Sequence, residues 1–313
     1  MVTPIKKQML HVKHLQKSFK DNTVLEDVTF DVTSGEVFVL LGSNGAGKTT
    51  LVKILSTILP FDQGTACING IDLTKDPAAI REKISLTGQF SAVDQELTGR
   101  ENLLMIAALR HVKNKQEIVE DLLTRFDLVD ASNRLVKDYS GGMRRRLDIA
   151  MSFIGEPDLL FLDEPTTGLD PQNRLATWHM IKEIAAQGRT IFLTTQYLEE
   201  AEFLADQVAI LHEGKIILQG TPTELKKLHP SQTMEISVLT KEHLQTLRQH
   251  LSDVPLQVNV SNLSLTLPVS QDFHHAFTLL QDLNQLPIII TSFSQKNVSL
   301  EDIFLTLVQG GTQ

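Results

Sequence analysis

The sequence predicts two domains, an α/β domain with a largely parallel sheet over residues 1–228 and a small α+β domain over residues 229–313. In the first domain, short uninterrupted apolar runs alternate with stretches of helical spacing, which is typical of buried parallel strands joined by helices. In the second, apolar and polar residues alternate, which is typical of strands with one exposed face. The length of 313 residues agrees with this division, since a domain averages about 150 residues.

The first domain begins with strand and helix signals in turn. Four apolar runs predict its strands, over residues 37–41, 159–162, 190–195 and 207–211. Between about residues 90 and 155 the pattern becomes helical, with Ile118, Leu122 and Phe126 at four-residue spacing. We therefore expect a helical subdomain over about 90–155, inserted into the α/β domain.

The second domain gives the order strand, helix, strand, strand, helix, strand. Its strands are expected around 234–238, 256–260, 263–267 and 287–293, and its helices around 244–251 and 273–280. A closing helix is expected over 300–308. This order predicts a ferredoxin-like arrangement.

The composition excludes several classes of function. Lys plus Arg is 29 and Asp plus Glu is 38, so the net charge is −9, which disfavours a bulk nucleic-acid binder. No stretch approaches the roughly 18 apolar residues that cross a bilayer. The single cysteine, Cys67, allows no internal disulfide and favours a reducing compartment. We expect the chain to stay in the cytoplasm and to reach a membrane through a partner.

Residues 42–49 read Gly-Ser-Asn-Gly-Ala-Gly-Lys-Thr and fit the phosphate-loop pattern G-x4-G-K-[ST]. The main-chain N–H groups of such a loop surround phosphate oxygens, and the start of the following helix adds a positive dipole end. Lys48 would reach the β- and γ-phosphates, and Thr49 would place its hydroxyl on Mg²⁺. A chance glycine-rich turn is the alternative, but a strand-like run before the loop and a helical pattern after it favour nucleotide binding.

Two adjacent acids, Asp163 and Glu164, follow the apolar run 159–162. Successive side chains on a strand point in opposite directions, so the two acids can serve two tasks. Asp163 could hold Mg²⁺ through water, and Glu164 could polarise the attacking water as a general base. A solvated strand end is the alternative, but the phosphate loop upstream favours the catalytic interpretation.

Taken together with residues 139–146, which read Tyr-Ser-Gly-Gly-Met-Arg-Arg-Arg, these motifs resemble the ATP-binding-cassette (ABC) ATPases. Residues 139–146 resemble the family signature, Gln89 the glutamine of the Q-loop, and 168–170 the D-loop. Phe19 lies where an aromatic residue usually stacks on adenine. The resemblance covers nearly the whole chain and implies a P-loop NTPase fold with ATP and Mg²⁺ as cofactors.

The resemblance also implies a role for each matched position. Catalytic roles fall on Lys48, Glu164 and Gln196, and metal-binding roles on Thr49, Gln89 and Asp163. The nucleotide-binding positions are Phe19, Gly42, Ser43, Asn44, Gly45, Ala46, Gly47, Lys48, Thr49, Thr50, Gln89, Ser140, Gly141 and Gly142.

Within the family, the sequence is most similar to the daunorubicin/doxorubicin-resistance type of drug-export ATPase. Residues 88–90, 97–103, 139–146 and 194–201 carry this resemblance, and the subgroup also has a small C-terminal domain that ends in a Ser-Leu-Glu-Asp-type helix, here 299–304. Gln196 replaces the usual switch histidine; its amide can still donate a hydrogen bond to a γ-phosphate oxygen but cannot carry a proton. Met143 replaces the usual signature glutamine.

The resemblance further implies the partners. Two cassettes pack head to tail so that the signature of one chain caps the ATP on the phosphate loop of the other, which predicts a homodimer in the ATP-bound state. A separate multi-span membrane permease is expected to contact the helical subdomain and to choose the cargo, which places the chain at the cytoplasmic face of the cell membrane. No nucleic acid is expected.

Two other functions stay open on the sequence. A soluble ABC ATPase that acts on ribosomes or nucleic acid shares the nucleotide site, but usually carries two cassettes, a coiled-coil arm or basic extensions, none of which this sequence has. A non-catalytic nucleotide sensor is disfavoured by Lys48, Asp163 and Glu164, although Gln196 keeps it open. The basic run 144–146 is expected to be a solvated helix face with room for one internal ion pair.

Overall fold

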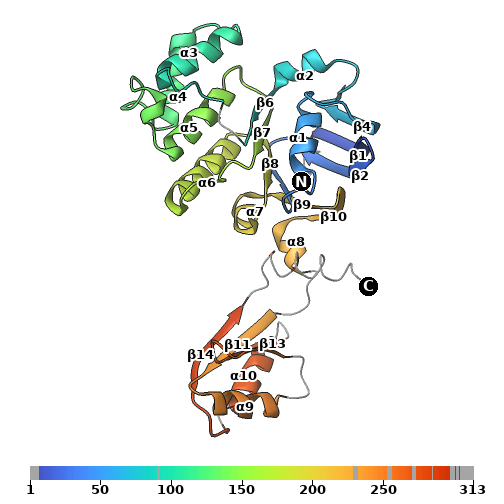
Figure 1. Cartoon of the computed structure of the whole chain (residues 1–313), viewed down its shortest axis with the longest axis vertical. Helices are drawn as coiled ribbons and strands as arrows, with labels where there is room; N and C mark the ends of the chain where they lie inside the picture. Colours follow the sequence, from blue (N-terminus) through green and yellow to red (C-terminus); the bar gives the residue numbers. More distant parts are fainter. Residues whose placement is uncertain are drawn as a thin grey trace, which may run out of the picture. The chain divides into compact units, whose positions relative to one another are not determined.

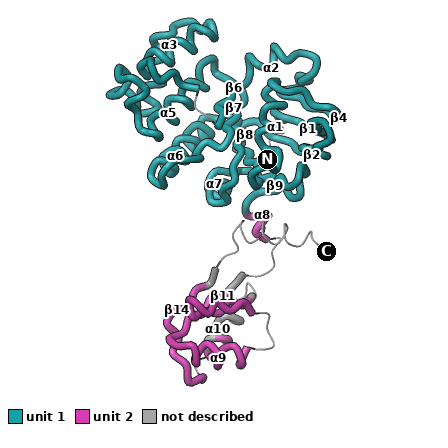
Figure 2. Tube along the Cα trace, viewed as in Figure 1, with its two compact units in different colours: residues 1–222 teal, residues 223–313 magenta. Residues whose placement is uncertain are grey.

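The computed structural model describes residues 7–89, 92–227, 232–251, 256–269, 273–283, 285–296, 300 and 303. The chain divides into two compact units, residues 1–222 and 223–313 (Figure 2). The helix α8 (Pro222–Lys227) lies at this division, whereas the sequence placed the boundary just after it, at 228/229. Each unit is described here by itself.

The first unit is built on a ten-stranded sheet in the order β5-β4-β1-β2-β10-β9-β3-β8-β7-β6. One half of it, β9-β3-β8-β7-β6, is parallel. Every residue of the central strands β3, β7 and β8 is buried, which is why these strands appear in the sequence as unbroken apolar runs. The strands of this half are β3 (Val37–Leu41), β6 (Ile84–Thr87), β7 (Leu159–Asp163), β8 (Thr190–Thr195) and β9 (Gln207–His212).

The other half of the sheet pairs mainly antiparallel, so the expectation of a largely parallel sheet is correct for only one half. A single parallel residue pair, Lys215 with Asp27, and a hydrogen bond from Glu26 N to Gly214 O at 2.9 Å join β2 to β10. We call this narrow connection the seam. The strands of this half are β1 (Gln8–Phe19), β2 (Asn22–Thr33), β4 (Gln63–Ile68), β5 (Ile71–Asp72) and β10 (Lys215–Gly220).

Helices flank the sheet, and three of them form a separate group in the upper left of Figure 1. These three, α3 (Gly99–Leu109), α4 (Lys115–Arg125) and α5 (Gly141–Ser152), lie within the segment 90–155 expected to be helical. Thr98 and Glu101 form a reciprocal capping box that starts α3. The remaining helices of the unit are α1 (Lys48–Leu55), α2 (Pro77–Lys83), α6 (Pro171–Ala186) and α7 (Leu198–Leu204), and a 3-10 turn, η1, spans Val136–Asp138.

Aromatic side chains fill the core beneath the centre of the sheet. Phe192 lies within 5.4–5.7 Å of Phe30, Phe38 and Phe161, measured between ring centroids. Each of these rings is at most 3% exposed. Burying one such side chain contributes about 1.5–3 kcal/mol to folding. These rings therefore stabilise the strands that carry the functional loops.

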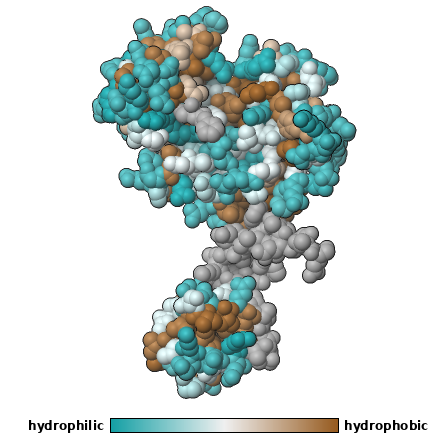
Figure 3. Space-filling view, viewed as in Figure 1, coloured by the Kyte–Doolittle hydropathy of each residue, from teal (hydrophilic) through white to brown (hydrophobic). Residues whose placement is uncertain are grey.

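The second unit has the predicted order βαββαβ, and its sheet order β12-β13-β11-β14 is that of a ferredoxin-like domain, which confirms the predicted fold. Large apolar side chains remain exposed on this unit, and Figure 3 shows apolar side chains gathered on the face in view. The closing helix expected over 300–308 falls almost entirely outside the described residues. The elements are β11 (Gln232–Val238), α9 (Lys241–His250), β12 (Gln257–Asn259), β13 (Ser264–Val269), α10 (Phe273–Leu283) and β14 (Ile290–Lys296).

Within the described parts of the chain, no helix combines the length and the apolar character needed to cross a membrane.

Candidate nucleotide-hydrolysis site

The predicted phosphate loop connects the end of the buried strand β3 to the start of α1. Gly47 is the N-cap of α1 and offers no side-chain cap, so the first N–H groups of the helix remain available to an anion. Gly47 has φ +108°, and a Cβ there would lie 2.7 Å from Leu25 Cδ2 and 3.0 Å from Val24 O. Only glycine fits this position without strain.

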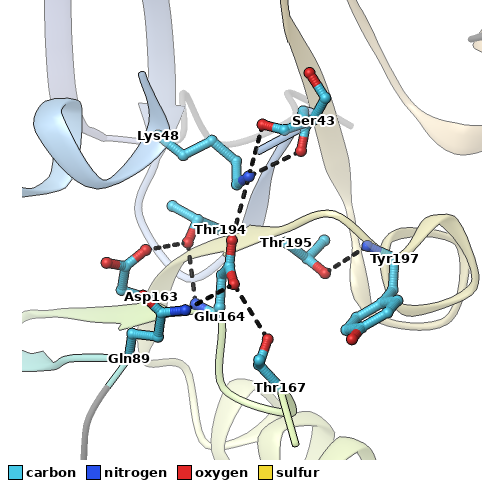
Figure 4. A network of polar contacts seen from close by, with 10 residues as sticks. Ser43, Lys48, Gln89, Asp163, Glu164, Thr167, Thr194, Thr195 and Tyr197 are labelled. Carbon is cyan, nitrogen blue, oxygen red and sulfur yellow. Dashed lines mark hydrogen bonds and ion pairs between the residues drawn. The ribbon is translucent and has the colours of Figure 1, made fainter. Parts of the chain in front are cut away.

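Lys48 lies inside the loop rather than in solvent (Figure 4). Its Nζ donates to Gly42 O at 2.8 Å and to Ser43 O at 3.1 Å, and forms an ion pair with Glu164 Oε1 at 3.2 Å. The two charged side chains are 4% and 8% exposed. The structure therefore brings together the ammonium group of one motif and the carboxylate of the other.

Asp163 and Glu164 follow from the end of β7, and the neighbouring strand β8 holds both in place. Thr194 pairs with Asp163 across the two strands; its hydroxyl donates to Asp163 Oδ1 at 2.5 Å and accepts from Glu164 N at 3.1 Å. Glu164 N also donates to Thr194 O at 3.1 Å. Glu164 has φ +48°, a left-handed conformation that costs about 1–2 kcal/mol for a residue with a Cβ. These hydrogen bonds offset that cost.

The second oxygen of the Glu164 carboxylate accepts two further hydrogen bonds. Thr167 Oγ1 donates to Glu164 Oε2 at 3.1 Å, and Gln89 Nε2 donates to the same oxygen at 3.5 Å. Glu164 is thus held by Lys48 on one oxygen and by neutral donors on the other (Figure 4).

A pocket of about 270 Å³ opens at this point. It unites predicted residues from the phosphate loop, the Q-loop segment and the end of β7. Its lining consists of Val24, Asn44, Gly45, Gly47, Lys48, Thr49, Thr50, Gln89 and Glu164.

Other predicted residues do not line this pocket. Gly42, Ser43 and Ala46 belong to the same loop, with Gly42 and Ser43 contributing the carbonyls that Lys48 contacts. Phe19 ends β1 and is 46% exposed, with Lys17 Nζ 5.3 Å from its ring centroid. Phe19 thus offers an open aromatic face.

Gln196 directly follows the buried strand β8 and is half-buried. The next residue is fixed by a local turn, in which Tyr197 N donates to Thr195 Oγ1 at 2.9 Å. Gln196 therefore stands at the end of the strand that neighbours both β3 and β7.

The predicted signature residues form a separate feature. Ser140 is the N-cap of α5 and accepts from Met143 N at 3.2 Å; Gly141 is exposed and Gly142 is buried against Asn173. None of the three lines the phosphate-loop pocket of the same chain. The helix start instead offers its N–H groups outside that pocket.

The donors near Lys48 fit Mg²⁺. Thr49 supplies a hydroxyl, Gln89 an amide oxygen and Asp163 a carboxylate, and Mg²⁺ commonly takes one or two protein oxygens with the rest from water and substrate phosphates. The described residues contain no cluster of three or more His, Cys, Asp or Glu side chains suited to a metal. The three oxygen groups suit a Mg²⁺ that a bound nucleotide helps to hold.

Asp170, in the segment that resembles the D-loop, caps α6. Asn173 N donates to Asp170 Oδ1 at 3.0 Å and Asn173 Nδ2 donates to Asp170 Oδ2 at 2.6 Å. These hydrogen bonds from Asn173 hold the pKa of Asp170 below its usual value.

Two threonines that contact the acidic pair, Thr194 and Thr167, were not predicted as site residues. Thr167 has no sequence signal. The pair Thr194-Thr195 stands at the end of an apolar run, and this position could have indicated that their hydroxyl groups contact the neighbouring strand. In the basic run 144–146, expected to be a solvated helix face, Arg145 is only 7% exposed; its ion pair with Asp148 at 3.1 Å is the single internal pair that the expectation allowed. Helical spacing alone does not tell which arginine faces the core.

Comparison with known protein families gives two matches. Residues 25–167 match the ABC transporter family, and residues 220–308 match the C-terminal domain of the ATP-binding protein DrrA1-3-like family. The first match lies within residues 1–228, and the second begins before residue 229 and covers most of the predicted C-terminal domain.

Individual relatives cover nearly the whole chain. The daunorubicin/doxorubicin resistance ATP-binding protein DrrA of Streptomyces peucetius is 40% identical over 94% of this chain and 90% of its own length. The linearmycin resistance ATP-binding protein LnrL of Bacillus subtilis (strain 168) is 31% identical over 96% of this chain and 98% of its own. A solved ATP-binding subunit of an ABC transporter is 33% identical, with a TM-score of 0.62, over 70% of this chain and 92% of its own.

Proposed function

The chain belongs to the family of ABC transporter ATP-binding proteins, and from this premise we propose that it binds and hydrolyses ATP to drive the efflux of drugs or other amphiphiles through a separate membrane permease. The observation that carries the proposal is the meeting of Lys48 and Glu164, 3.2 Å apart, in one pocket with the phosphate loop. The names of the relatives, which describe resistance proteins, support export of amphiphiles.

Each predicted group would have a task in hydrolysis. Lys48 and the N–H groups at the start of α1 would bind the β- and γ-phosphates. Glu164 would orient the attacking water and accept its proton. Thr49, Gln89 and Asp163 would hold Mg²⁺, which when bound neutralises phosphate charge. Gln196 would donate its amide to the γ-phosphate.

The ATP-bound state is proposed to be a homodimer. One chain carries one phosphate loop and one signature, and Ser140, Gly141 and Gly142 lie outside the pocket of their own chain. A two-fold arrangement completes both sites with the same surface on each chain. Hydrolysis then removes the γ-phosphate that bridges the two chains, which loosens the pair.

A separate multi-span permease is proposed as the second partner, at the cytoplasmic face of the membrane. Met105 and Leu109 leave apolar surface exposed on α3, in the helical group that the family resemblance connects with a permease. We propose that the second unit steadies the dimer or the permease contact. Deleting residues after Pro230 should then impair assembly more than ATP binding, and unchanged assembly and transport would remove that role.

A direct test is phosphate release by the purified full-length chain with ATP and Mg²⁺. The wild type should turn over ATP, and Lys48→Met and Glu164→Gln should each lower kcat by at least a hundredfold. Lys53→Met is the matched control, because Lys53 lies on the same helix with an exposed side chain and should keep wild-type turnover. ATP binding without turnover in the wild type would identify a nucleotide sensor instead.

Two further measurements test the partners. Glu164→Gln should form dimers when ATP is added, and a chain that stays monomeric at saturating ATP contradicts the homodimer. Purification from membranes should recover a multi-span protein with the chain. Tight ribosome binding without a membrane partner would favour the soluble class of ABC ATPase, which the names of these relatives do not support.

A further inference from the structure

Arg145 is a buried cation that the proposed chemistry does not use. It lies one turn into α5, the helix that begins at the signature, and its side chain is 8% exposed. The neighbouring arginines behave differently. Arg144 and Arg146 reach main-chain carbonyls within the helical group itself, and Arg146 pairs with the exposed Asp127.

The hydrogen bonds of Arg145 leave the helical group and reach the segments that carry Glu164 and Gln89. Arg145 Nε donates to Pro165 O at 2.7 Å, one residue after Glu164. Arg145 Nη1 donates to Gly88 O at 2.9 Å, one residue before Gln89. One planar guanidinium group thus ties α5 to the main chain beside both residues, in a geometry that a point-like ammonium group cannot reproduce.

A second set of contacts fixes the orientation of Arg145. Arg145 Nη1 also donates to Asp148 Oδ2 at 3.1 Å, and Asp148 Oδ1 accepts from Ala92 N at 3.2 Å. Burial lowers the pKa of Arg145, while the charge of Asp148 opposes this shift. Within the described part of the chain, Arg145 Nη2 is buried without a hydrogen-bond partner. Burying the charge of Arg145 costs solvation free energy, and an apolar side chain of similar volume at this position would avoid that cost.

A buried acidic side chain also contacts the segment that follows Glu164. Glu200, on α7, accepts from Thr166 Oγ1 and from Trp178 Nε1, both at 2.8 Å. Burial raises the pKa of Glu200, and the positive charge of Arg145 opposes this shift. The short segment between Glu164 and Thr167 is thus held from α5 through Pro165 and from α7 through Thr166.

We propose that Arg145 is a positioning residue that couples the signature helix of each chain to the catalytic glutamate and the Q-loop glutamine of the same chain. The inference rests on the proposed function, in which the signature caps the nucleotide of the partner chain. When that contact seats α5, the guanidinium group sets the main chain at Gly88 and Pro165, and so places Gln89 and Glu164. Contact of the signature with the nucleotide at one site of the dimer thereby changes the placement of Gln89 and Glu164 at the other site.

The test compares Arg145→Lys with Arg110→Lys in the full-length chain. Arg110 is the control, because its guanidinium group also donates to two main-chain carbonyls, Arg81 O and Ile84 O, neither of which is adjacent in sequence to Gln89 or Glu164. Arg145→Lys should lower kcat at least tenfold and leave the affinity for ATP within about twofold. Arg110→Lys should keep kcat within about twofold of the wild type.

A second readout separates coupling from a general structural role. In the Glu164→Gln background, Arg145→Lys should still form the ATP-dependent dimer, because Ser140, Gly141 and Gly142 are untouched. Loss of the dimer would show that Arg145 acts by shaping the interface and would overturn the inference. Turnover by Arg145→Lys equal to that of Arg110→Lys would overturn it as well.

The inference stays testable if Arg145→Lys fails to fold. Asp148→Asn keeps an acceptor for Arg145 Nη1 and should lower kcat at least threefold with unchanged ATP affinity, and wild-type turnover there would refute the role. A wild-type chain without any turnover refutes the proposed function and this inference with it. An active wild type with insensitive variants refutes only the inference.

Discussion

Replacing Lys48 with methionine should destabilise the first unit by about 3 kcal/mol. Lys48 and Glu164 form an ion pair at 3.2 Å and are 4% and 8% exposed. Removing one partner of a buried pair costs about 3–5 kcal/mol, because the other charge is left uncompensated. The lower end applies here, since Thr167 Oγ1 and Gln89 Nε2 still donate to Glu164 Oε2.

Urea unfolding followed by tryptophan fluorescence measures this loss. The chain has one tryptophan, Trp178, which lies on α6 in the first unit and is 5% exposed, so its emission reports the unfolding of that unit. The double variant Lys48→Met with Glu164→Gln should lose about 1–3 kcal/mol less than the sum of the two single variants, because neither charge is left alone. The exposed Lys53→Met should change the free energy of unfolding by at most about 0.5 kcal/mol.

The outcome that refutes this reasoning is additivity. If the losses of the two single variants sum to that of the double variant within about 0.5 kcal/mol, the two side chains do not stabilise each other. The compensation attributed to the pair would then be wrong, and Lys48 would owe its position to the carbonyls of Gly42 and Ser43 alone.

Three further changes test other contacts. Thr194→Val should destabilise the first unit by about 1–2 kcal/mol, measured by the same fluorescence, because the hydroxyl that bonds Asp163 Oδ1 and Glu164 N is lost; a neutral result would contradict that bond. Gly47→Ala should cost about 3 kcal/mol and weaken ATP binding measured by calorimetry, since φ is +108° and the new methyl group meets Leu25; unchanged binding would argue against the strained loop. Burial raises the pKa of Glu200 above 4.5, so the folded state holds a proton that the unfolded state has lost, and stability falls as pH rises above that value. Glu200→Gln has no titrating group at this position, so its free energy of unfolding should rise relative to that of the wild type as the pH increases. Equal pH dependence of the two free energies would rule out the raised pKa.

The parts of the fold that were predictable are those with local signals. Residues 37–41 and 190–195 are buried on both faces and therefore form unbroken apolar runs. The antiparallel half was not predicted, because register shifts such as that between Val12 and Leu15 interrupt the alternation along β1. The order of elements in the second unit followed from alternation and helical spacing, and the structure confirms it.

The residues of the candidate site also fall into those that a local sequence signal located and those that it did not. Lys48 and Glu164 stand in motifs whose chemistry is local, so the sequence located them. Thr194 donates to Asp163 because β7 and β8 are neighbours in a particular register, and strand register cannot be deduced from one sequence. Arg145 differs from Arg144 and Arg146 only in the direction that one helical position faces, and the surrounding fold decides that.

The seam in the ten-stranded sheet has a mechanical consequence. Phe19 ends a strand on one side of it, whereas the loop that contains Lys48 follows a strand on the other side. A nucleotide with its base on Phe19 and its phosphates on that loop would span the seam and connect the strands β5-β4-β1-β2 to the strands β10-β9-β3-β8-β7-β6, two groups that share little main-chain bonding across the seam. Ligand occupancy would then stiffen the whole sheet against shear, so that amides far from the pocket, on both sides of the seam, exchange their hydrogens more slowly.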